Sequence, residues 1–378
     1  MRVLVATTAG SGHFGPVVPF ARALVDRGHD VVVTSPASFK TAVERSGFVH
    51  QPFADAPADE QSAIFARLRD VTNDEGNGIV IREIFGRINT RAALPDTQAF
   101  VERWRPDLVL REPAELSSYI AADTAGVPHV QVSCSLAAIE AGMPRLMEEP
   151  LGEIAPGCSI AGLEAAPRLT LVPHSFEDPA LPGSADRFGE HTSPAPGGDL
   201  PDWWPGLDGP LVYVTFGSVA ASIGMFPDLY RSVIAALAGR GVRVLLTLGE
   251  AGDPEALQPL PGNIHVKKFW PQLDVMVHAA AMVGHGGFGT TLIGLASGVP
   301  AVVVPLFADQ PANARRVHDV GAGIALEGGP AAISGLGDAV ERVLREVSFR
   351  TRAGAIAAEI AALPPVADAV PIIEGLAG

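Results

Sequence analysis

The chain has 378 residues, of which 47% are hydrophobic and 18% are charged, and its formal net charge at pH 7 is −15. This length suits two domains of ordinary size, and the composition excludes a disordered chain. The acidic balance argues against nucleic acid or an anionic membrane surface as the main partner.

The N-terminal residues predict a strand and a turn, and they lack the flanks and the length of a signal peptide. The longest apolar run, residues 299–307, is interrupted by prolines and is far shorter than the roughly 20 residues that span a bilayer. Cys134 and Cys158 are the only cysteines, and their spacing matches no metal or redox motif. We therefore expect a cytoplasmic protein with reduced thiols and no stable membrane insertion, for which a homodimer stays open.

The first half of the chain begins with alternating strands and helices, which predicts an α/β domain. Strands are expected at 2–7 and 30–34, a glycine turn at 9–16, and helices at about 17–27 and 38–46. A long helix is expected at about 79–105, interrupted near Pro95, and strands at 107–110 and 129–133 flank a helix at 116–125. The segments 55–77 and 137–168 show no regular pattern, and a further strand is expected at 168–173.

Prolines and glycines crowd residues 178–210, and this shift of composition marks a domain boundary. The alternation then restarts with strands at 211–216, 242–248, 263–269, 281–283 and 323–326, and with helices at 227–238, 311–320, 335–346 and 350–362. We expect an N-terminal domain over residues 1–200, a C-terminal domain over residues 207–360, and a tail, 361–378, that packs back on the N-terminal domain.

The most informative stretch is the glycine-dense turn at 284–291, which joins a strand to a helix and contains His285. Glycines leave backbone N–H groups uncovered where the helix begins, and a helix N-terminus attracts negative charge. Thr290 and Thr291 could cap this helix or donate to an oxygen. The turn therefore predicts a diphosphate site.

Both glycine turns, 10–15 and 284–289, also match the dinucleotide fingerprint G-x-G-x-x-G. That motif requires an acidic residue at the end of the next strand, but the second strand ends at Ser35 and Pro36, and Asp309 lies beyond its strand. A nicotinamide-dependent oxidoreductase is therefore disfavoured. Two histidine-bearing turns, in two separate halves, also weaken the alternative that the glycines serve turn geometry alone.

These motifs resemble family 1 glycosyltransferases of the GT-B fold, and most of all the bacterial branch that attaches deoxysugars to antibiotic aglycones. The resemblance spans the chain and is strongest over residues 211–323. It implies an α/β fold of two facing Rossmann-like domains with parallel sheets and an interdomain cleft. It also implies inverting transfer of a sugar from a nucleotide diphosphate donor to a hydrophobic natural product, with no metal and no cofactor beyond the donor.

The resemblance further implies roles for residues of the C-terminal half. The turn at 285–291 would cradle the donor's diphosphate, the Ser218 hydroxyl would reach the β-phosphate, and Phe269 would stack on the nucleobase. The donor-binding set is Gly217, Ser218, Phe269, Trp270, Gln272, His285, Gly287, Gly289, Thr290, Asp309 and Gln310, of which the last two would hold the sugar. One of the two rings at 269–270 could instead belong to the core.

One departure from the family pattern concerns the nucleotide. Relatives that use UDP-sugars often carry a glutamate, which grips the ribose hydroxyls, where this chain has Ile293. A buried apolar side chain would leave a 2′-OH without a partner, at a cost of about 1–3 kcal/mol. Thymidine diphosphate has no 2′-OH, so we expect a dTDP-sugar donor.

His13 matches the family's general base, which deprotonates the acceptor hydroxyl, since histidine titrates near neutrality. The resemblance assigns its orienting carboxylate to Glu112, with Glu115 as the alternative. The resemblance also implies an acceptor-side loop of Gly10, Ser11, Gly12 and Phe14. The chemistry would be general-base catalysis plus electrostatic stabilisation of the leaving diphosphate.

Three other functions remain open from the sequence. The acceptor-facing segments contain no motif that identifies the acceptor. Transfer to carbon in an aromatic polyketide is therefore an alternative to transfer to oxygen. The chain could also be a catalytically idle homologue that binds or activates a partner, or an epimerase or hydrolase on the same scaffold. Transfer to oxygen is the leading prediction, and the intact motif residues of both halves argue against the idle homologue.

Overall fold

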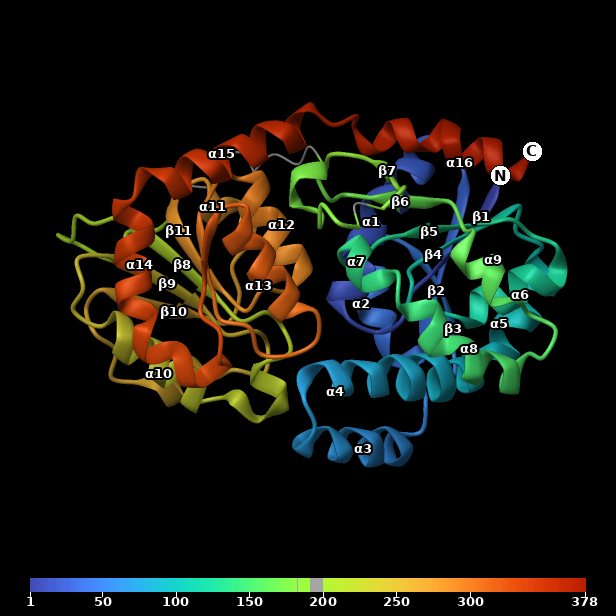
Figure 1. Cartoon of the computed structure of the whole chain (residues 1–378), viewed down its shortest axis with the longest axis horizontal. Helices are drawn as coiled ribbons and strands as arrows, with labels where there is room; N and C mark the ends of the chain where they lie inside the picture. The colour runs from blue at the N-terminus through green and yellow to red at the C-terminus, as the bar shows by residue number, and fades with distance from the viewer. Residues whose placement is uncertain (182, 191–199) are drawn as a thin grey trace. The chain divides into compact units, whose positions relative to one another are not determined.

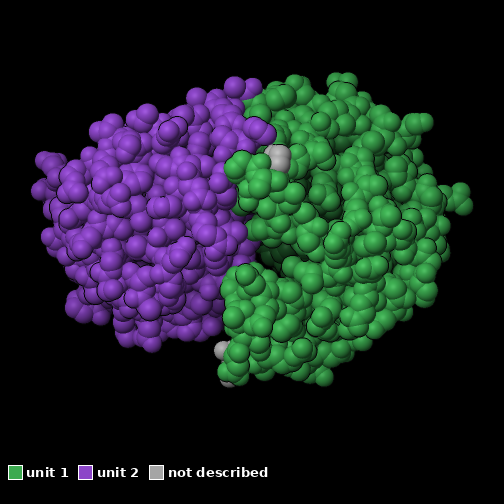
Figure 2. All heavy atoms as spheres, in the orientation of Figure 1, with its two compact units in different colours: residues 1–172, 177–190, 363–378 green, residues 173–176, 191–362 purple. Residues whose placement is uncertain are grey.

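The computed structural model describes residues 1–181, 183–190 and 200–378. They form two compact units, distinguished by colour in Figure 2. Unit 1 contains residues 1–172, 177–190 and 363–378, and unit 2 contains residues 173–176 and 191–362. Of the stretch 178–210, in which we placed the domain boundary, residues 182 and 191–199 lie outside the described residues.

The sheet of unit 1 is parallel, with the strand order β3-β2-β1-β4-β5-β6-β7 (Figure 1). Its central strands are short apolar runs buried on both faces, as helix-covered parallel sheets require. Leu4 pairs with Val32 on one side and with Val109 on the other. The strands are β1 (Arg2–Ala6), β2 (Asp30–Pro36), β3 (Val49–Phe53), β4 (Leu108–Arg111), β5 (His129–Val132), β6 (Arg168–Thr170) and β7 (Asp186–Arg187).

Helices cover this sheet, and α5 and α6 pack on β1, β2 and β4 through Phe100, Val101, Ala121 and Ala122. The α-helices of unit 1 are α1 (Ser11–Asp26), α2 (Lys40–Arg45), α3 (Ala58–Arg67), α4 (Asn73–Ile79), α5 (Thr90–Trp104), α6 (Ser117–Ala125), α7 (Ala137–Glu140), α8 (Met143–Ile154), α9 (Ile160–Glu164) and α16 (Ala369–Ala377). A π-helix, Val80–Asn89, runs directly into α5.

Several local predictions for unit 1 were wrong. Helix α1 begins at Ser11 instead of Val17, because part of the expected glycine turn is already helical. Pro95 lies inside α5 without interrupting it, since burial of the helix outweighs the loss of one N–H donor. The segments 55–77 and 137–168 contain helices α3, α4, α7, α8 and α9. Their apolar residues were too sparse for helices to be predicted, but Met147 and Leu151 of α8 are buried against neighbouring helices.

Residues 363–378 belong to unit 1, where α16 lies beside α1. His29 Nε2 and Glu374 Oε1 lie 3.0 Å apart, and the backbone of Gly189 bridges to Pro365 in parallel. The chain therefore leaves unit 1, builds unit 2 and returns to complete unit 1.

Unit 2 repeats the architecture with a parallel sheet in the order β10-β9-β8-β11-β12-β13 (Figure 1). Its strands are β8 (Leu211–Thr215), β9 (Arg243–Thr247), β10 (Ile264–Lys267), β11 (Ala279–Gly284), β12 (Ala301–Val303) and β13 (Gly323–Ala325). Its α-helices are α10 (Asp228–Leu237), α11 (Gln272–Met276), α12 (Phe288–Ala296), α13 (Gln310–Asp319), α14 (Leu336–Arg345) and α15 (Val347–Ala362).

The strand order reverses at one point in each sheet, between β1 and β4 in unit 1 and between β8 and β11 in unit 2. Loops that follow adjacent strands diverge there, which opens a crevice at the carboxyl ends of the strands. The residues that follow β1, β4, β8 and β11 are therefore where each unit can hold a ligand. Across the described residues, every helix is too short or too polar to cross a membrane.

Candidate active site and donor site

His13 and Glu112 meet at the switch point of unit 1. His13 lies in the first turn of α1, which follows β1, and Glu112 directly follows β4. The Nδ1–H of His13 donates to Oε2 of Glu112 over 3.1 Å, although 99 positions separate the two residues in sequence. The imidazole is 25% exposed and the carboxylate is fully buried, so the pair presents one polar ring to the surface.

Glu112 is held by two further donors. The backbone N–H of Thr8 donates to Oε1 over 3.0 Å, and that of Ala114 donates to Oε2 over 2.6 Å. Burial alone would raise the pKa of Glu112, but His13 and these N–H groups outweigh it and lower that pKa. The carboxylate is therefore ionised and fixed, as an orienting group must be.

The alternative orienting residue, Glu115, has another partner. It is also buried, but its oxygens accept from the backbone N–H groups of Ser117 and Ser118 at the start of α6. Burial raises its pKa. Between the two carboxylates that the sequence offered, Glu112 is the one in contact with His13.

The predicted acceptor-side loop is only partly at the surface. Ser11 and Gly12 are exposed, and Gly10 adopts a φ of 122°, which favours glycine. Phe14, in contrast, is 4% exposed, with its ring edge-on to Phe39 and Phe48. We therefore assign Phe14 to the core of unit 1.

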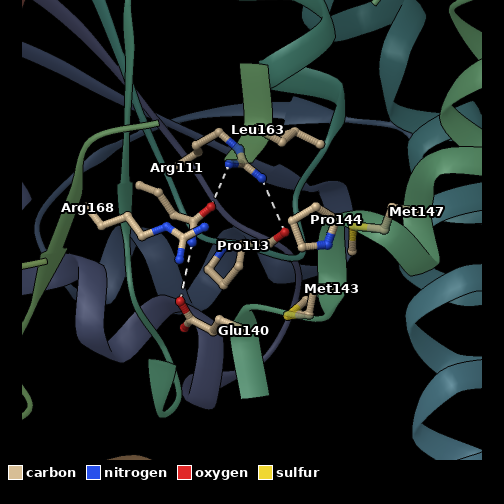
Figure 3. Close-up of a pocket in the computed structure, with 9 residues that line it drawn as sticks. Arg111, Pro113, Glu140, Met143, Pro144, Met147, Leu163 and Arg168 are labelled. Atoms are coloured by element: carbon tan, nitrogen blue, oxygen red, sulfur yellow. Dashed lines mark hydrogen bonds between the residues drawn. The ribbon is translucent and has the colours of Figure 1, made fainter. Parts of the chain in front are cut away.

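A buried polar network begins at Arg111, the last residue of β4 and the neighbour of Glu112 in sequence (Figure 3). Arg111 is 1% exposed and donates to the backbone oxygens of Pro113 and Glu115 and to Gln131 Oε1. Gln131 Nε2 in turn donates to Glu140, whose pKa is raised to about 7 by burial. The cavity beside them measures about 10 Å³ and is also lined by Met143 and Met147. It is too small for an acceptor, because even a water molecule needs about 10–15 Å³.

Cys134, which sequence spacing did not connect to any site, lies beside the same pair. It follows β5, and its Sγ is 3.8 Å from His13 Nδ1. Its backbone N–H donates to Glu140 Oε1 over 2.8 Å, so the buried network also fixes this loop. A sequence separation of 121 between the two residues left no local signal of this proximity.

In unit 2, two glycines make room for the His285 ring. A Cβ atom at Gly217, after β8, would lie 2.8 Å from Nε2 of His285, and one at Gly287 would lie 2.3 Å from it. Both separations are shorter than real Cβ contacts allow. The loops after β8 and β11 therefore close on His285, at the switch point of this sheet.

Burial lowers the pKa of His285 to about 4, against the opposing effect of the Thr215 backbone. The ring is therefore neutral at physiological pH and can only donate or accept a hydrogen bond. Helix α12 begins just beyond it, with Gly287 as N-cap and no side-chain cap. Thr290 and Thr291 do not cap this helix; Thr290 Oγ1 accepts from Gln272 Nε2 over 3.2 Å. The exposed Gly289 lies in the first turn.

Asp309 and Gln310 lie at the start of α13, after β12, and differ in burial. Gln310 is 4% exposed, and its Oε1 accepts from the N–H groups of Leu306 and Phe307. Asp309 is half-buried and accepts from Asn313 Nδ2 over 2.8 Å. Gln310 thus stabilises its own loop, while the side chain of Asp309 is partly exposed.

Sequence reasoning missed Asn313, which is fully buried in α13. Its Nδ2 also donates to the backbone oxygen of Gly286 over 2.9 Å. One side chain therefore ties the glycine turn after β11 to Asp309. Its spacing of four from Asp309 on one helix face is the signal that could have revealed it.

Of the two aromatic residues after β10, one ring is exposed and the other packs on neighbouring rings. Phe269 is 67% exposed, which suits a stacking surface. Trp270 packs edge-on to Trp203 at 4.8 Å, and Trp203 itself stacks on His265 at 4.5 Å. Ser218 is exposed after β8, and Ile293 is half-buried on α12, where we had expected full burial.

Comparisons with known proteins point to one family. The N-terminal and C-terminal domain models of the erythromycin biosynthesis protein CIII-like family match residues 22–142 and 231–376. The chain is 31% identical to the 4′-demethylrebeccamycin synthase of Lentzea aerocolonigenes, with 99% of each sequence covered.

Two solved structures are each 26% identical to the chain. The glycosyltransferase SnogD of Streptomyces nogalater has a TM-score of 0.79, with 100% of both chains covered. The Streptomyces glycosyltransferase SsfS6, complexed with thymidine diphosphate, has a TM-score of 0.72, with 99% of both chains covered. The chain therefore belongs to the erythromycin biosynthesis protein CIII-like family and is a natural-product glycosyltransferase of family 1, with the GT-B fold.

Proposed function

We propose that the enzyme moves a deoxysugar from a dTDP-sugar to a hydroxyl of a hydrophobic natural-product aglycone, with inversion and with His13 as general base. The acceptor oxygen attacks the anomeric carbon, the bond from that carbon to the diphosphate breaks, and dTDP leaves. The acceptor proton passes to His13. The observation that carries this proposal is the hydrogen bond from His13 to the fully buried Glu112.

That hydrogen bond selects the tautomer that a base needs. With the Nδ1 proton donated to Glu112, the lone pair of the neutral ring lies on Nε2. Glu112 remains ionised, so it also stabilises the imidazolium that forms when Nε2 takes the proton. Glu112 therefore acts as a positioning residue and His13 as the catalytic one.

We assign the donor to the switch point of unit 2. The uncapped start of α12 offers backbone N–H groups and a positive dipole end to the diphosphate. His285 contributes as a neutral hydrogen-bond donor, since its pKa of about 4 excludes a cationic role near pH 7. Ser218 adds a hydroxyl, the exposed Phe269 ring is the stacking surface for the base, and Asp309 binds the sugar.

We infer a thymidine nucleotide from Ile293, and a structure of a similar enzyme supports this choice. The apolar side chain offers no partner to a ribose 2′-OH, whose burial without one costs about 1–3 kcal/mol. The similar enzyme SsfS6 was solved with thymidine diphosphate. We therefore expect dTDP to bind more tightly than UDP by about one to two orders of magnitude.

The test is an incubation of the enzyme with a panel of dTDP- and UDP-deoxysugars and with aromatic and polyketide aglycones, followed by mass spectrometry. A glycosylated product that releases its sugar in acid, formed from dTDP donors and lost in His13→Ala, supports O-transfer with this base. Full activity of His13→Ala contradicts the base assignment, and binding of UDP as tight as that of dTDP contradicts the nucleotide assignment.

A further inference from the structure

The contacts of His13 extend beyond the hydrogen bond that catalysis would use. His13, Glu112 and Cys134 follow β1, β4 and β5, and one ligand atom of each lies within 4.8 Å of the other two. The separations from His13 Nδ1 are 3.1 Å to Glu112 Oε2 and 3.8 Å to Cys134 Sγ. No role in the transfer reaction accounts for a thiol at this place.

We propose that His13, Glu112 and Cys134 bind a thiophilic divalent cation such as Zn²⁺, and that its binding switches the transfer reaction off. The inhibitory part rests on the proposed role of His13 as base, whereas the binding part does not.

The distances fit a tetrahedral zinc ion. Bonds of about 2.0–2.3 Å to nitrogen, oxygen and sulfur place tetrahedral ligand atoms roughly 3.3–3.6 Å apart. The observed separations, 3.1 Å and 3.8 Å, differ from these values by only a few tenths of an ångström. Three protein ligands leave a fourth position for water, and the partial exposure of His13 and Cys134 provides the way in.

The charges and ligand types also select this class of ion. One thiolate and one carboxylate balance a dication, so no net charge is left in a site of which Glu112 is fully buried. Sulfur and imidazole ligands favour Zn²⁺ and similar ions, whereas Mg²⁺ and Ca²⁺ prefer oxygen ligands throughout.

The ligands are held in place before any ion arrives. Backbone N–H groups of Thr8 and Ala114 fix Glu112, and Glu140 accepts from the N–H groups of Cys134 and Ser135. Such outer contacts orient the ligands of metal sites, so little reorganisation opposes binding.

Inhibition is expected because the ion would bind the Nδ1 atom of His13. Bound at Nδ1, the ion displaces the proton there, and the neutral ring then carries its proton on Nε2. The lone pair that would accept the substrate proton is lost. The Cys134 thiol releases one proton to solvent as it becomes a thiolate ligand. Metal ions of this class would thus act as inhibitors of an enzyme whose reaction needs none.

The binding test uses metal-free protein and Co²⁺ as a spectroscopic probe. We expect one equivalent to produce a thiolate-to-cobalt charge-transfer band, which excess Zn²⁺ abolishes. Cys134→Ser should lose this band, and Cys158→Ser, at the other cysteine of the chain, should retain it. Absence of the band in the wild type, or an equal band in Cys134→Ser, overturns the metal site.

The inhibition test follows dTDP release with Zn²⁺ or Mg²⁺ added. Zn²⁺ should stop turnover and Mg²⁺ should not, while a chelator should leave the basal rate of the wild type intact. In Cys134→Ser, the Zn²⁺ concentration for half-inhibition, measured against that variant's own rate, should rise at least about 10-fold. Cobalt binding without zinc inhibition overturns the inhibitory part, while the activity of His13→Ala decides separately whether His13 is the base. Inhibition that is equal in the two proteins places the inhibitory ion elsewhere.

Discussion

Replacing Glu112 by glutamine tests whether this buried carboxylate sets the tautomer of His13. Glu112 accepts three hydrogen bonds, from His13 Nδ1, Thr8 N–H and Ala114 N–H. A glutamine has a single acceptor oxygen, and its NH₂ group would face donors 2.6 Å and 3.1 Å away if the oxygen served Thr8. In that orientation His13 can satisfy the amide only by accepting through Nδ1, which moves its proton to Nε2. With the oxygen turned to Ala114 and His13 instead, the NH₂ group faces the Thr8 N–H and the tautomer is kept, but either orientation removes the negative charge that stabilises the imidazolium.

The expected loss follows from the missing negative charge, to which the orientation with the oxygen toward Thr8 adds the wrong tautomer. A general base contributes about 10²–10⁴-fold to the rate, and a carboxylate-to-amide change that imposes the wrong tautomer costs about 10⁴-fold in a serine protease triad. We expect kcat to fall by about 10²–10⁴-fold, while KM for the donor stays within about threefold because the donor is assigned to unit 2. Leaving a buried N–H without a partner should also cost about 1–3 kcal/mol of stability.

The assay measures dTDP release at saturating donor and acceptor, together with thermal unfolding of each variant. Glu115→Gln is the matched control, since Glu115 is equally buried but bonds Ser117 and Ser118. That variant should lose stability and keep its kcat. The reasoning is refuted if Glu112→Gln retains kcat within about threefold of the wild type, or if Glu115→Gln loses as much.

Three further substitutions probe other parts of the chain. Ile293→Glu should tighten UDP relative to dTDP by about 10-fold, as measured by calorimetry, because the new carboxylate can accept from a 2′-OH; an unchanged ratio contradicts the nucleotide assignment. Asn313→Ala removes the bonds to Gly286 and Asp309, so donor affinity should fall about 10-fold or more with a loss of about 1–3 kcal/mol of stability; donor binding equal to the wild type would show that this tie does not matter. Burial raises the pKa of Glu140 from 4.5 to about 7. Its contribution to stability is therefore complete below the pKa of the unfolded chain and is lost as the pH rises through about 7. Between about pH 5 and pH 8, the free energy of unfolding should therefore fall by about 2–3 kcal/mol less in Glu140→Gln than in the wild type, as measured by denaturant titrations. Parallel pH profiles of the two proteins would contradict this.

The sequence predicted the architecture well because alternating buried strands and helices are a local pattern. Apolar β-branched runs such as 3–5 and 301–304 have one stable environment, a covered parallel sheet. Segments whose structure depends on distant partners were not predictable in this way. Helix α8 is rich in proline and glutamate, and it is stabilised by contacts with the π-helix and with α9.

The same division holds for the site. The glycine turns carry a local signal, so the loops that follow β1 and β11 were identifiable. Family resemblance then pointed to Glu112 and Glu115, but only the fold shows which of them contacts His13. Cys134 escaped notice because its partner His13 lies 121 positions away. The bond from Asn313 to Gly286 was missed because it joins segments that follow two different strands. Burial likewise decided that Phe14 belongs to the core and that His285 is neutral.

The discontinuity of unit 1 has a consequence for synthesis of the protein. Strand β1 and helix α1 emerge from the ribosome before unit 2, but α16, which packs beside α1 and bonds His29 through Glu374, emerges after the whole of unit 2. The apolar surface that α16 covers, against Ala369, Val370 and Ile373, stays open throughout that interval. Unit 2, which is nearly continuous in sequence, can therefore finish folding first, and the unit that carries His13 is completed last.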